Sequence, residues 1–149
     1  MIAKFLLGFF LLALPTMAEA ALTCGVTSTG VAFGNWSATS SNTTGTITVS
    51  CGGASSASYT ISLSTGSGTY ATRLMLSGTK TLSYNMFSNS SRTTIWGNGT
   101  SGTSRVSGSL TIPGSSTRSR THTIYARVAS TPKPSAGVYS DTIVVTVIY

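Results

Sequence analysis

The feature that most constrains the fold of this chain is a series of short segments in which apolar and polar residues alternate. Segments 45–51 (GTITVSC) and 58–64 (SYTISLS) both place apolar side chains at every second position. Such alternation predicts β-strands with one buried face. Similar apolar or alternating runs occupy residues 72–76, 80–87, 105–112, 121–128 and 138–149.

Turn-forming residues separate these segments, and no stretch after residue 20 shows the apolar spacing of an amphipathic helix. About seven or eight short strands joined by glycine-containing and proline-containing turns are typical of a β-sandwich. Residues 37–44 and 115–120, rich in serine and threonine, are predicted to be loops. The sequence therefore predicts a single all-β domain with helices short or absent.

The first residues are predicted to be a secretory signal peptide. Lys4 precedes an apolar run over residues 5–14, and Ala18 and Ala20 form a small-residue cleavage site. The run is too short to span a bilayer, which requires about 20 apolar residues. We therefore expect cleavage after Ala20, a mature domain over residues 21–149, export, and no stable membrane insertion once the signal is removed.

The charge of the chain is strongly basic, with nine Lys/Arg, two Asp/Glu and a formal net charge of +7. Because Glu19 falls within the predicted signal, Asp141 is the only acid of the mature domain. The cations are scattered singly, apart from Arg118 and Arg120. This scatter and the predicted export favour a solvated basic surface, Arg73 included, and argue against a nucleic-acid partner. Weak attraction to anionic cell-surface polymers is the lesser alternative.

The two cysteines, Cys24 and Cys51, both lie in the mature domain. An exported protein meets an oxidising compartment, where an even pair is expected to form a disulfide. A metal site would need further ligands, and the mature domain holds one His and one acid. We therefore expect a structural disulfide, no metal and no cofactor.

Composition allows a Ser-His-Asp triad through His122 and Asp141, but the sequence gives neither residue a supporting context. His122 falls within an alternating segment, Asp141 precedes the last predicted strand, and no serine lies in a nucleophile elbow. A single carboxylate cannot form the acid–base pair of a glycosidase. We therefore expect that the protein is not an enzyme.

Several short motifs follow one another along the mature domain. They are 24–26 (CGV), 31–34 (VAFG), 45–51 (GTITVSC), 59–66 (YTISLSTG), 73–75 (RLM), 82–87 (LSYNMF), 96–99 (WGNG) and 137–149 (GVYSDTIVVTVIY). In this order they resemble the spore coat protein U domain, the pilin domain of archaic, Csu-type chaperone–usher pili. The resemblance covers essentially the whole mature domain.

This resemblance implies an incomplete immunoglobulin-like β-sandwich, a pilin fold that lacks its final strand. A groove then stays open until a strand from a chaperone or a neighbouring subunit fills it. Carried onto this sequence, the groove wall is the strand over residues 142–149, whose odd positions are wholly apolar. The residues expected to face the groove and bind the chaperone or donor strand are Ile143, Val145, Val147 and Tyr149, with Thr142 and Thr146 facing outward.

The resemblance also implies partners: a periplasmic pilus chaperone, an outer-membrane usher and other pilin subunits. Such a protein passes through the periplasm to the cell surface or a pilus. Fibre-forming members carry a donor strand before the first cysteine, whereas residues 21–23 alone precede Cys24 in the expected mature domain. At about 3.3 Å per residue, this segment cannot fill a groove along a sandwich. We therefore expect a subunit that accepts a strand without donating one.

The place of such a subunit is left open by the sequence. One role is at the fibre tip, in adhesion and biofilm formation, although tip adhesins of the family usually have two such domains. The alternatives are a self-sufficient secreted coat protein and a carbohydrate-binding module that stacks sugars on aromatic side chains. The aromatic residues that could do so, or could instead fill the core, are Tyr84, Phe87, Trp96, Tyr125 and Tyr139.

Overall fold

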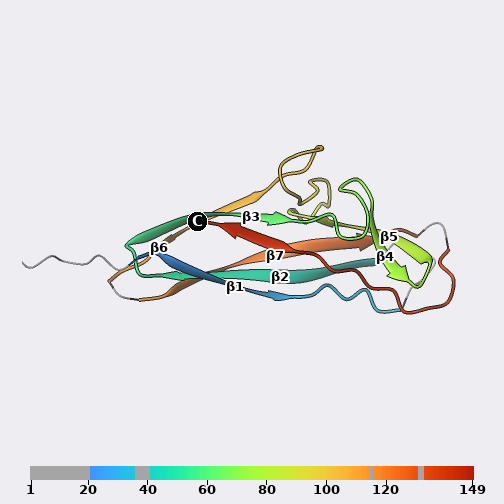
Figure 1. Cartoon of the computed structure of the whole chain (residues 1–149), viewed down its shortest axis with the longest axis horizontal. Coiled ribbons are helices and arrows are strands. Elements are labelled where there is room, and N and C mark those ends of the chain that lie inside the picture. Colours follow the sequence, from blue (N-terminus) through green and yellow to red (C-terminus); the bar gives the residue numbers. More distant parts are fainter. Residues whose placement is uncertain (1–20, 36–40, 115, 131–132) are drawn as a thin grey trace, which may run out of the picture.

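The computed structural model describes residues 21–35, 41–114, 116–130 and 133–149. The predicted signal peptide, including Ala18 and Ala20, lies outside the described residues. Every regular element within them is a strand, so the all-β prediction is confirmed (Figure 1). The strands are β1 (Thr23–Thr29), β2 (Ser41–Gly52), β3 (Ser56–Leu63), β4 (Arg73–Ser77), β5 (Lys80–Phe87), β6 (Val106–Thr111), β7 (Arg118–Val128) and β8 (Val145–Ile148).

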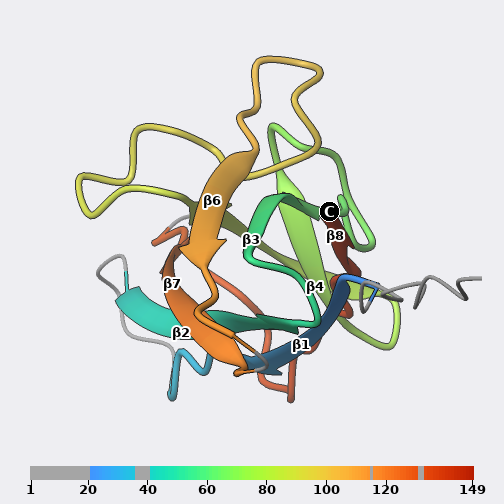
Figure 2. The ribbon, with the colours of Figure 1, turned by 90° about the vertical axis from the view of Figure 1, so that its left-hand side faces the viewer.

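The strands form two sheets that make the predicted sandwich. One sheet has the order β1-β2-β7-β5-β4 and the other the order β6-β3-β8. Every neighbouring pair is antiparallel. Viewed from one end of the sandwich, β6, β3 and β8 form one layer, and β1, β2 and β7 belong to the other (Figure 2). In the described part of the chain, no helix is long and apolar enough to cross a membrane.

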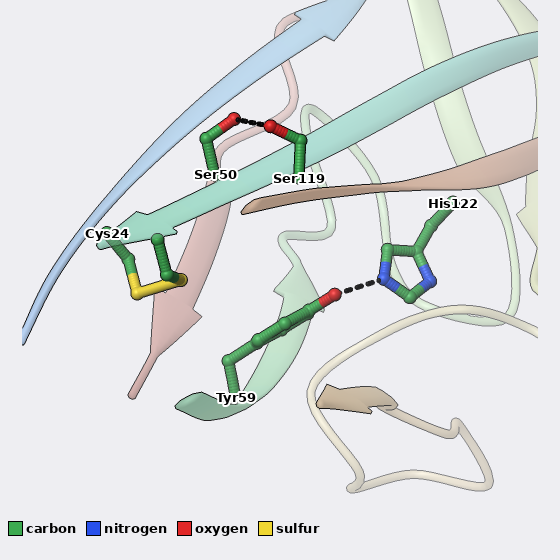
Figure 3. The surroundings of a disulfide bond; sticks show 6 residues. Cys24, Ser50, Tyr59, Ser119 and His122 are labelled. Carbon is green, nitrogen blue, oxygen red and sulfur yellow. Dashed lines mark hydrogen bonds between the residues drawn. A yellow bond between two sulfur atoms is a disulfide. The ribbon is translucent and has the colours of Figure 1, made fainter. Parts of the chain in front are cut away.

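The pairing of β2 with β7 shows how alternation makes the larger sheet two-faced. The two strands pair along almost their whole length. Ile47 and Val49 of β2 point inward and are fully buried. The intervening positions carry hydroxyl groups, and Ser50 and Ser119 share a hydrogen bond of 2.7 Å across the two strands (Figure 3). One face of the sheet therefore packs on the core, and the other is polar.

The core lies between the sheets and includes one fully buried tryptophan. Ile61 and Leu63 of β3 face it, and Trp96 is completely inaccessible. The indole Nε1 of Trp96 donates a hydrogen bond of 3.1 Å to the carbonyl oxygen of Ile61. Burying an apolar side chain stabilises a fold by about 1.5–3 kcal/mol, provided that its polar atoms find partners. Trp96 is therefore a core residue.

The predicted disulfide joins β1 to β2 (Figure 3). Cys24 and Cys51 lie directly opposite each other in the strand register, with a Cα–Cα distance of 4.1 Å. Cys51 is fully buried. The bond therefore fastens the edge strand β1 to the interior of its own sheet.

Two predicted loops are wrong in part. The loop expected over residues 37–44 is strand from Ser41 onward, and the loop expected over 115–120 is strand from Arg118 onward. Residues 37–40 and 115 lie outside the described residues. Both errors have the same cause. The start of β2 pairs with the end of β7 and the start of β7 with the end of β2, since Ser41 lies opposite Val128 and Arg118 opposite Cys51. Such distant pairing overrides the local preference of serine-rich segments for loops.

The strand predicted over residues 138–149 is shorter than expected, because this segment divides between the two sheets. Ser140 exchanges two backbone hydrogen bonds with Leu76 of β4, at 2.8 and 3.0 Å. From Val145 onward the chain instead pairs with β3. Regular strand structure is thus limited to β8, and the preceding residues cross from one sheet to the other.

Candidate functional site

Two strand edges are free on the same side of the sandwich. Among the described residues, β1 is paired with β2 alone and β8 with β3 alone. Figure 2 shows β1 and β8 at the same side of the two layers. A free edge presents a row of unpaired backbone groups, which proteins normally cover or blunt. This side of the sandwich is therefore open.

The inward face of β1 is incompletely covered. Val26 lies opposite Val49 and, as its register partner, points to the same face of the sheet. Val49 is fully buried, yet Val26 is 44% exposed. The difference arises because the three-stranded sheet ends at β8 and does not extend over β1.

The chain leading into β8 alternates in the same inward and outward manner. Ile143, Val145 and Val147 are partly buried and pack against the core. Val144 and Ile148 are 60% and 61% exposed. The side chains of Thr142 and Thr146 are also exposed, and Tyr149, which was assigned to the groove face, is 55% exposed.

The backbone groups of β8 alternate as well. At its start, Ser64 N donates to Val144 O at 3.0 Å, and Val144 N donates to Ser64 Oγ at 2.9 Å. In an antiparallel ladder, consecutive residues point their N–H and C=O groups to opposite sides. The N–H and C=O groups of Val145 and Val147 therefore point away from β3, toward the free edge.

A hollow of about 290 Å³ lies between these two edges. A second hollow, of about 670 Å³, shares Val31, Phe33, Met75 and Tyr139 with the first. We call the two together the β1–β8 groove. One wall is formed by residues 28–31 and Phe33, the other by Tyr139–Asp141, Ile143 and Val145, and the floor by Leu63, Tyr84, Met86 and Ile124.

The walls that follow β1 and the floor of the groove were missed from the sequence. Val31 and Phe33 belong to a short apolar motif after β1. The motif is visible in the sequence, but the sequence does not show which part of the fold it packs against. Gly45 of β2 lets this segment pass close by, because a Cβ there would lie 2.8 Å from Thr29 O. The chain beyond β1 therefore runs against the sheet and closes one side of the groove.

Asp141 fastens the crossing segment at the groove wall. Its Oδ1 accepts hydrogen bonds from Ser67 N at 3.0 Å and Ser67 Oγ at 2.9 Å, and its Oδ2 accepts one from the Tyr84 hydroxyl at 2.7 Å. Burial, together with the hydrogen bond to Asp141, raises the pKa of Tyr84 well above its usual value. The only acid of the described residues is therefore engaged in holding the C-terminal segment in place.

Arg73 was predicted to lie on a solvated surface, and this prediction is wrong. Its side chain is fully buried. The guanidinium donates to Ser64 O from Nε at 3.0 Å and from Nη2 at 2.8 Å, to Trp96 O at 2.7 Å and to Asn85 Oδ1 at 2.6 Å. Burial lowers the pKa of Arg73. Because Ser64 also holds Val144, Arg73 stabilises the position at which β8 begins.

His122 and Asp141 belong to separate networks. Nε2 of His122 lies 2.9 Å from the hydroxyl of Tyr59, and the two rings meet edge to face (Figure 3). Burial, and secondarily the charge of Arg120, lowers the pKa of His122. Asp141 instead contacts Ser67 and Tyr84, so the described contacts do not assemble the two residues into a triad. No group of three metal-ligating side chains occurs within the described ranges.

The aromatic residues considered for sugar stacking are dispersed. Tyr84 and Trp96 are buried in the core. Tyr139 lines the β1–β8 groove. Phe87 and Tyr125 lie opposite each other on β5 and β7. These side chains therefore do not form one exposed platform.

Comparison with known proteins identifies a family and a fold. The model of the Spore Coat Protein U domain matches residues 10–146. A crystal structure described as the CsuC–CsuE chaperone–tip adhesion subunit pre-assembly complex, from archaic chaperone-usher Csu pili of Acinetobacter baumannii, contains a similar chain with a TM-score of 0.61 and 24% identity. The match covers 87% of this chain and 40% of that one. No curated protein matches the chain.

Proposed function

The chain belongs to the Spore Coat Protein U domain family, and on this premise we propose that it is a structural subunit of an archaic chaperone–usher pilus or cell-surface coat. Its mechanism is to accept a strand from another chain in the β1–β8 groove. The observation that carries this proposal is the open side of the sandwich, where two free strand edges flank a hollow of about 290 Å³. The protein acts by assembly and not by catalysis.

The incoming strand adds to the free edge of β8. Its backbone pairs with the outward N–H and C=O groups of Val145 and Val147, and alternate side chains enter the groove. Each backbone hydrogen bond contributes about 0.5–1.5 kcal/mol, and each buried aliphatic side chain about 1.5–3 kcal/mol. Several of each make a gross gain comparable with the whole stability of a domain, about 5–15 kcal/mol. The filled domain is therefore expected to be much more stable than the open one.

The partners proposed here are a periplasmic chaperone, an outer-membrane usher and other pilin subunits. Residues 1–20 direct export and are removed after Ala20, and the chain then passes through the periplasm to the cell surface. The solved complex with a similar fold pairs a chaperone with a tip adhesion subunit. A place at the fibre tip, in adhesion and biofilm formation, is accordingly the first position to test.

Capture by a periplasmic chaperone encoded near this gene tests the proposal. Val145→Lys and Val147→Lys place charges on the inward side and should abolish co-purification with the chaperone. Thr142→Lys and Thr146→Lys are matched controls, because they add the same charge at exposed positions. Loss of capture in the threonine variants, with capture intact in the valine variants, would refute the assignment of the groove face.

The stability of the wild-type chain gives a second, independent test. The thermal unfolding midpoint of the captured chain should exceed that of the free chain by well over 10 °C, since about 3 kcal/mol already corresponds to such a shift in a domain of this size. A free chain that is monomeric and as stable as the captured one would contradict strand acceptance. That result would favour a self-sufficient coat domain.

A further inference from the structure

A cluster of arginines and aromatic rings lies on the polar face of the larger sheet. Tyr125 of β7 and Phe87 of β5 are register partners and point away from the core, opposite to the buried Ala126. The guanidinium of Arg92 lies 5.7 Å from the ring centroid of Tyr125, and that of Arg127 lies 6.0 Å from the ring centroid of Phe87. We call these four residues the guanidinium–aromatic patch. It lies on the opposite face of the sheet from the β1–β8 groove.

The loop before β6 holds Arg92 in a specific position. Arg92 has a φ of 54°, a left-handed conformation that is rare for residues other than glycine and asparagine. Asn89 stabilises this turn, since its carbonyl oxygen accepts from Arg92 N at 3.0 Å and its Oδ1 accepts from Thr94 N at 3.0 Å. The Arg92 side chain then reaches the sheet, where Nε donates to Ala126 O at 3.2 Å. Backbone strain of this kind is concentrated at functional sites.

The patch carries two positive charges, and Arg127 has unused hydrogen-bond donors, whereas Arg92 also donates from Nη1 to Ser90 O at 3.1 Å. Nε of Arg127 donates to Asn42 Oδ1 at 3.1 Å, and its two terminal nitrogens have no hydrogen-bond acceptor among the described residues. Asp141, the only acid in the described part of the chain, is engaged at the groove. A guanidinium with free terminal nitrogens can bind a carboxylate or sulfate through two N–H groups at once.

Rows of hydroxyl groups extend from the patch along the same face. Three register pairs of β2 and β7 carry them: Thr46 with Thr123, Thr48 with Thr121, and Ser50 with Ser119. Thr48 and Thr121 are joined by a hydrogen bond of 2.8 Å. Each hydroxyl can both donate and accept, which suits the hydroxyl groups of a sugar chain.

We propose that the polar face of the larger sheet binds an acidic polysaccharide. The guanidinium groups of Arg92 and Arg127 bind its carboxylate or sulfate groups, and the hydroxyl rows contact its sugar hydroxyls. The rings of Phe87 and Tyr125 act as positioning residues that hold the two arginines. This activity is independent of strand acceptance, because it uses the other face of the sheet.

The test is binding of the folded, full chain to alginate, a uronate polymer, with neutral dextran and duplex DNA as parallel ligands at one fixed ionic strength. Arg92→Gln combined with Arg127→Gln should weaken alginate binding by about tenfold, through loss of two charge-assisted contacts. The matched control is Arg118→Gln combined with Arg120→Gln, which removes the same charge from the same sheet and should weaken binding by less than about twofold. Tyr125→Leu keeps both charges and should weaken binding by about threefold, through loss of one exposed cation–π contact.

Circular dichroism of each variant must show an unchanged fold, and chaperone capture should be unaffected in all of them. Equal loss of binding in the patch and control double variants would overturn the proposal, because net charge alone would then explain the binding. Equal affinity for dextran would overturn the role of the arginines. If duplex DNA bound equally tightly and with the same dependence on the patch, the proposed ligand would be a nucleic acid and not a polysaccharide.

Discussion

Replacing Arg73 by Met is expected to destabilise the fold strongly, although the sequence surroundings of this residue suggest an exposed position. The substitution leaves the part-buried carbonyl oxygen of Ser64 and the buried carbonyl oxygen of Trp96 without the donors that Arg73 supplies. Each buried polar group left unpaired costs about 1–3 kcal/mol, and removal of a buried charge offsets part of this. We expect a net loss of about 3 kcal/mol, or about 10 °C in the unfolding midpoint.

The assay is urea unfolding followed by far-ultraviolet circular dichroism and tryptophan fluorescence. Arg105→Met is the matched control, because Arg105 is exposed and, within the described part of the chain, its side chain makes a single hydrogen bond, to the loop carbonyl Asn98 O. Such surface changes usually alter stability by no more than about 0.5 kcal/mol. Hydrogen exchange adds a local readout, since the amides of Ser64 and Val144 should lose protection in the Arg73 variant before the core does. Equal stability of the two variants would refute the role given to Arg73.

Three further predictions concern the backbone, the histidine and the disulfide. Gly66→Ala should destabilise the chain by more than about 2 kcal/mol in thermal unfolding, because Gly66 has a φ of 62° and an added Cβ would overlap Asp141. Gly78→Ala has a similar φ but open space around the added Cβ, and should cost only about 1 kcal/mol. The pKa of His122 is lowered in the folded state, so the unfolded chain binds a proton at a higher pH than the folded chain does. The free energy of unfolding should therefore fall as the pH drops below about 6.5 and level off below the folded pKa. This pH dependence should be absent in His122→Gln. Reduction of the disulfide, whose cysteines are 27 residues apart, should lower the free energy of unfolding by about 3–4 kcal/mol, measured with and without reductant.

The elements that the sequence predicted well are those whose signal is local. The alternation of segment 58–64 placed β3 almost correctly, and segment 80–87 coincides with β5. The disulfide followed from cysteine number and compartment. In each case neighbouring residues, or the chemistry of a single residue type, carry the information.

The elements that were missed depend on partners distant in the chain. Edge strand β1 has a sequence rich in serine, threonine and glycine (TCGVTST), and its apolar alternation is limited to Cys24 and Val26. It is a strand because residues 46–52 lie opposite it and the disulfide fastens it there. Arg73 likewise has an ordinary local sequence, and its acceptors come from Ser64, Asn85 and Trp96.

Local periodicity was enough to determine that this chain makes β-strands with one apolar face, because side chains in a strand alternate regardless of what the strand meets. The open side could not be read from periodicity, since it depends on which strands have no neighbour. Val26 and Val49 are both valines in paired strands, yet one is 44% exposed and the other fully buried. That difference is set by where the second sheet ends, which is a property of the assembled sandwich.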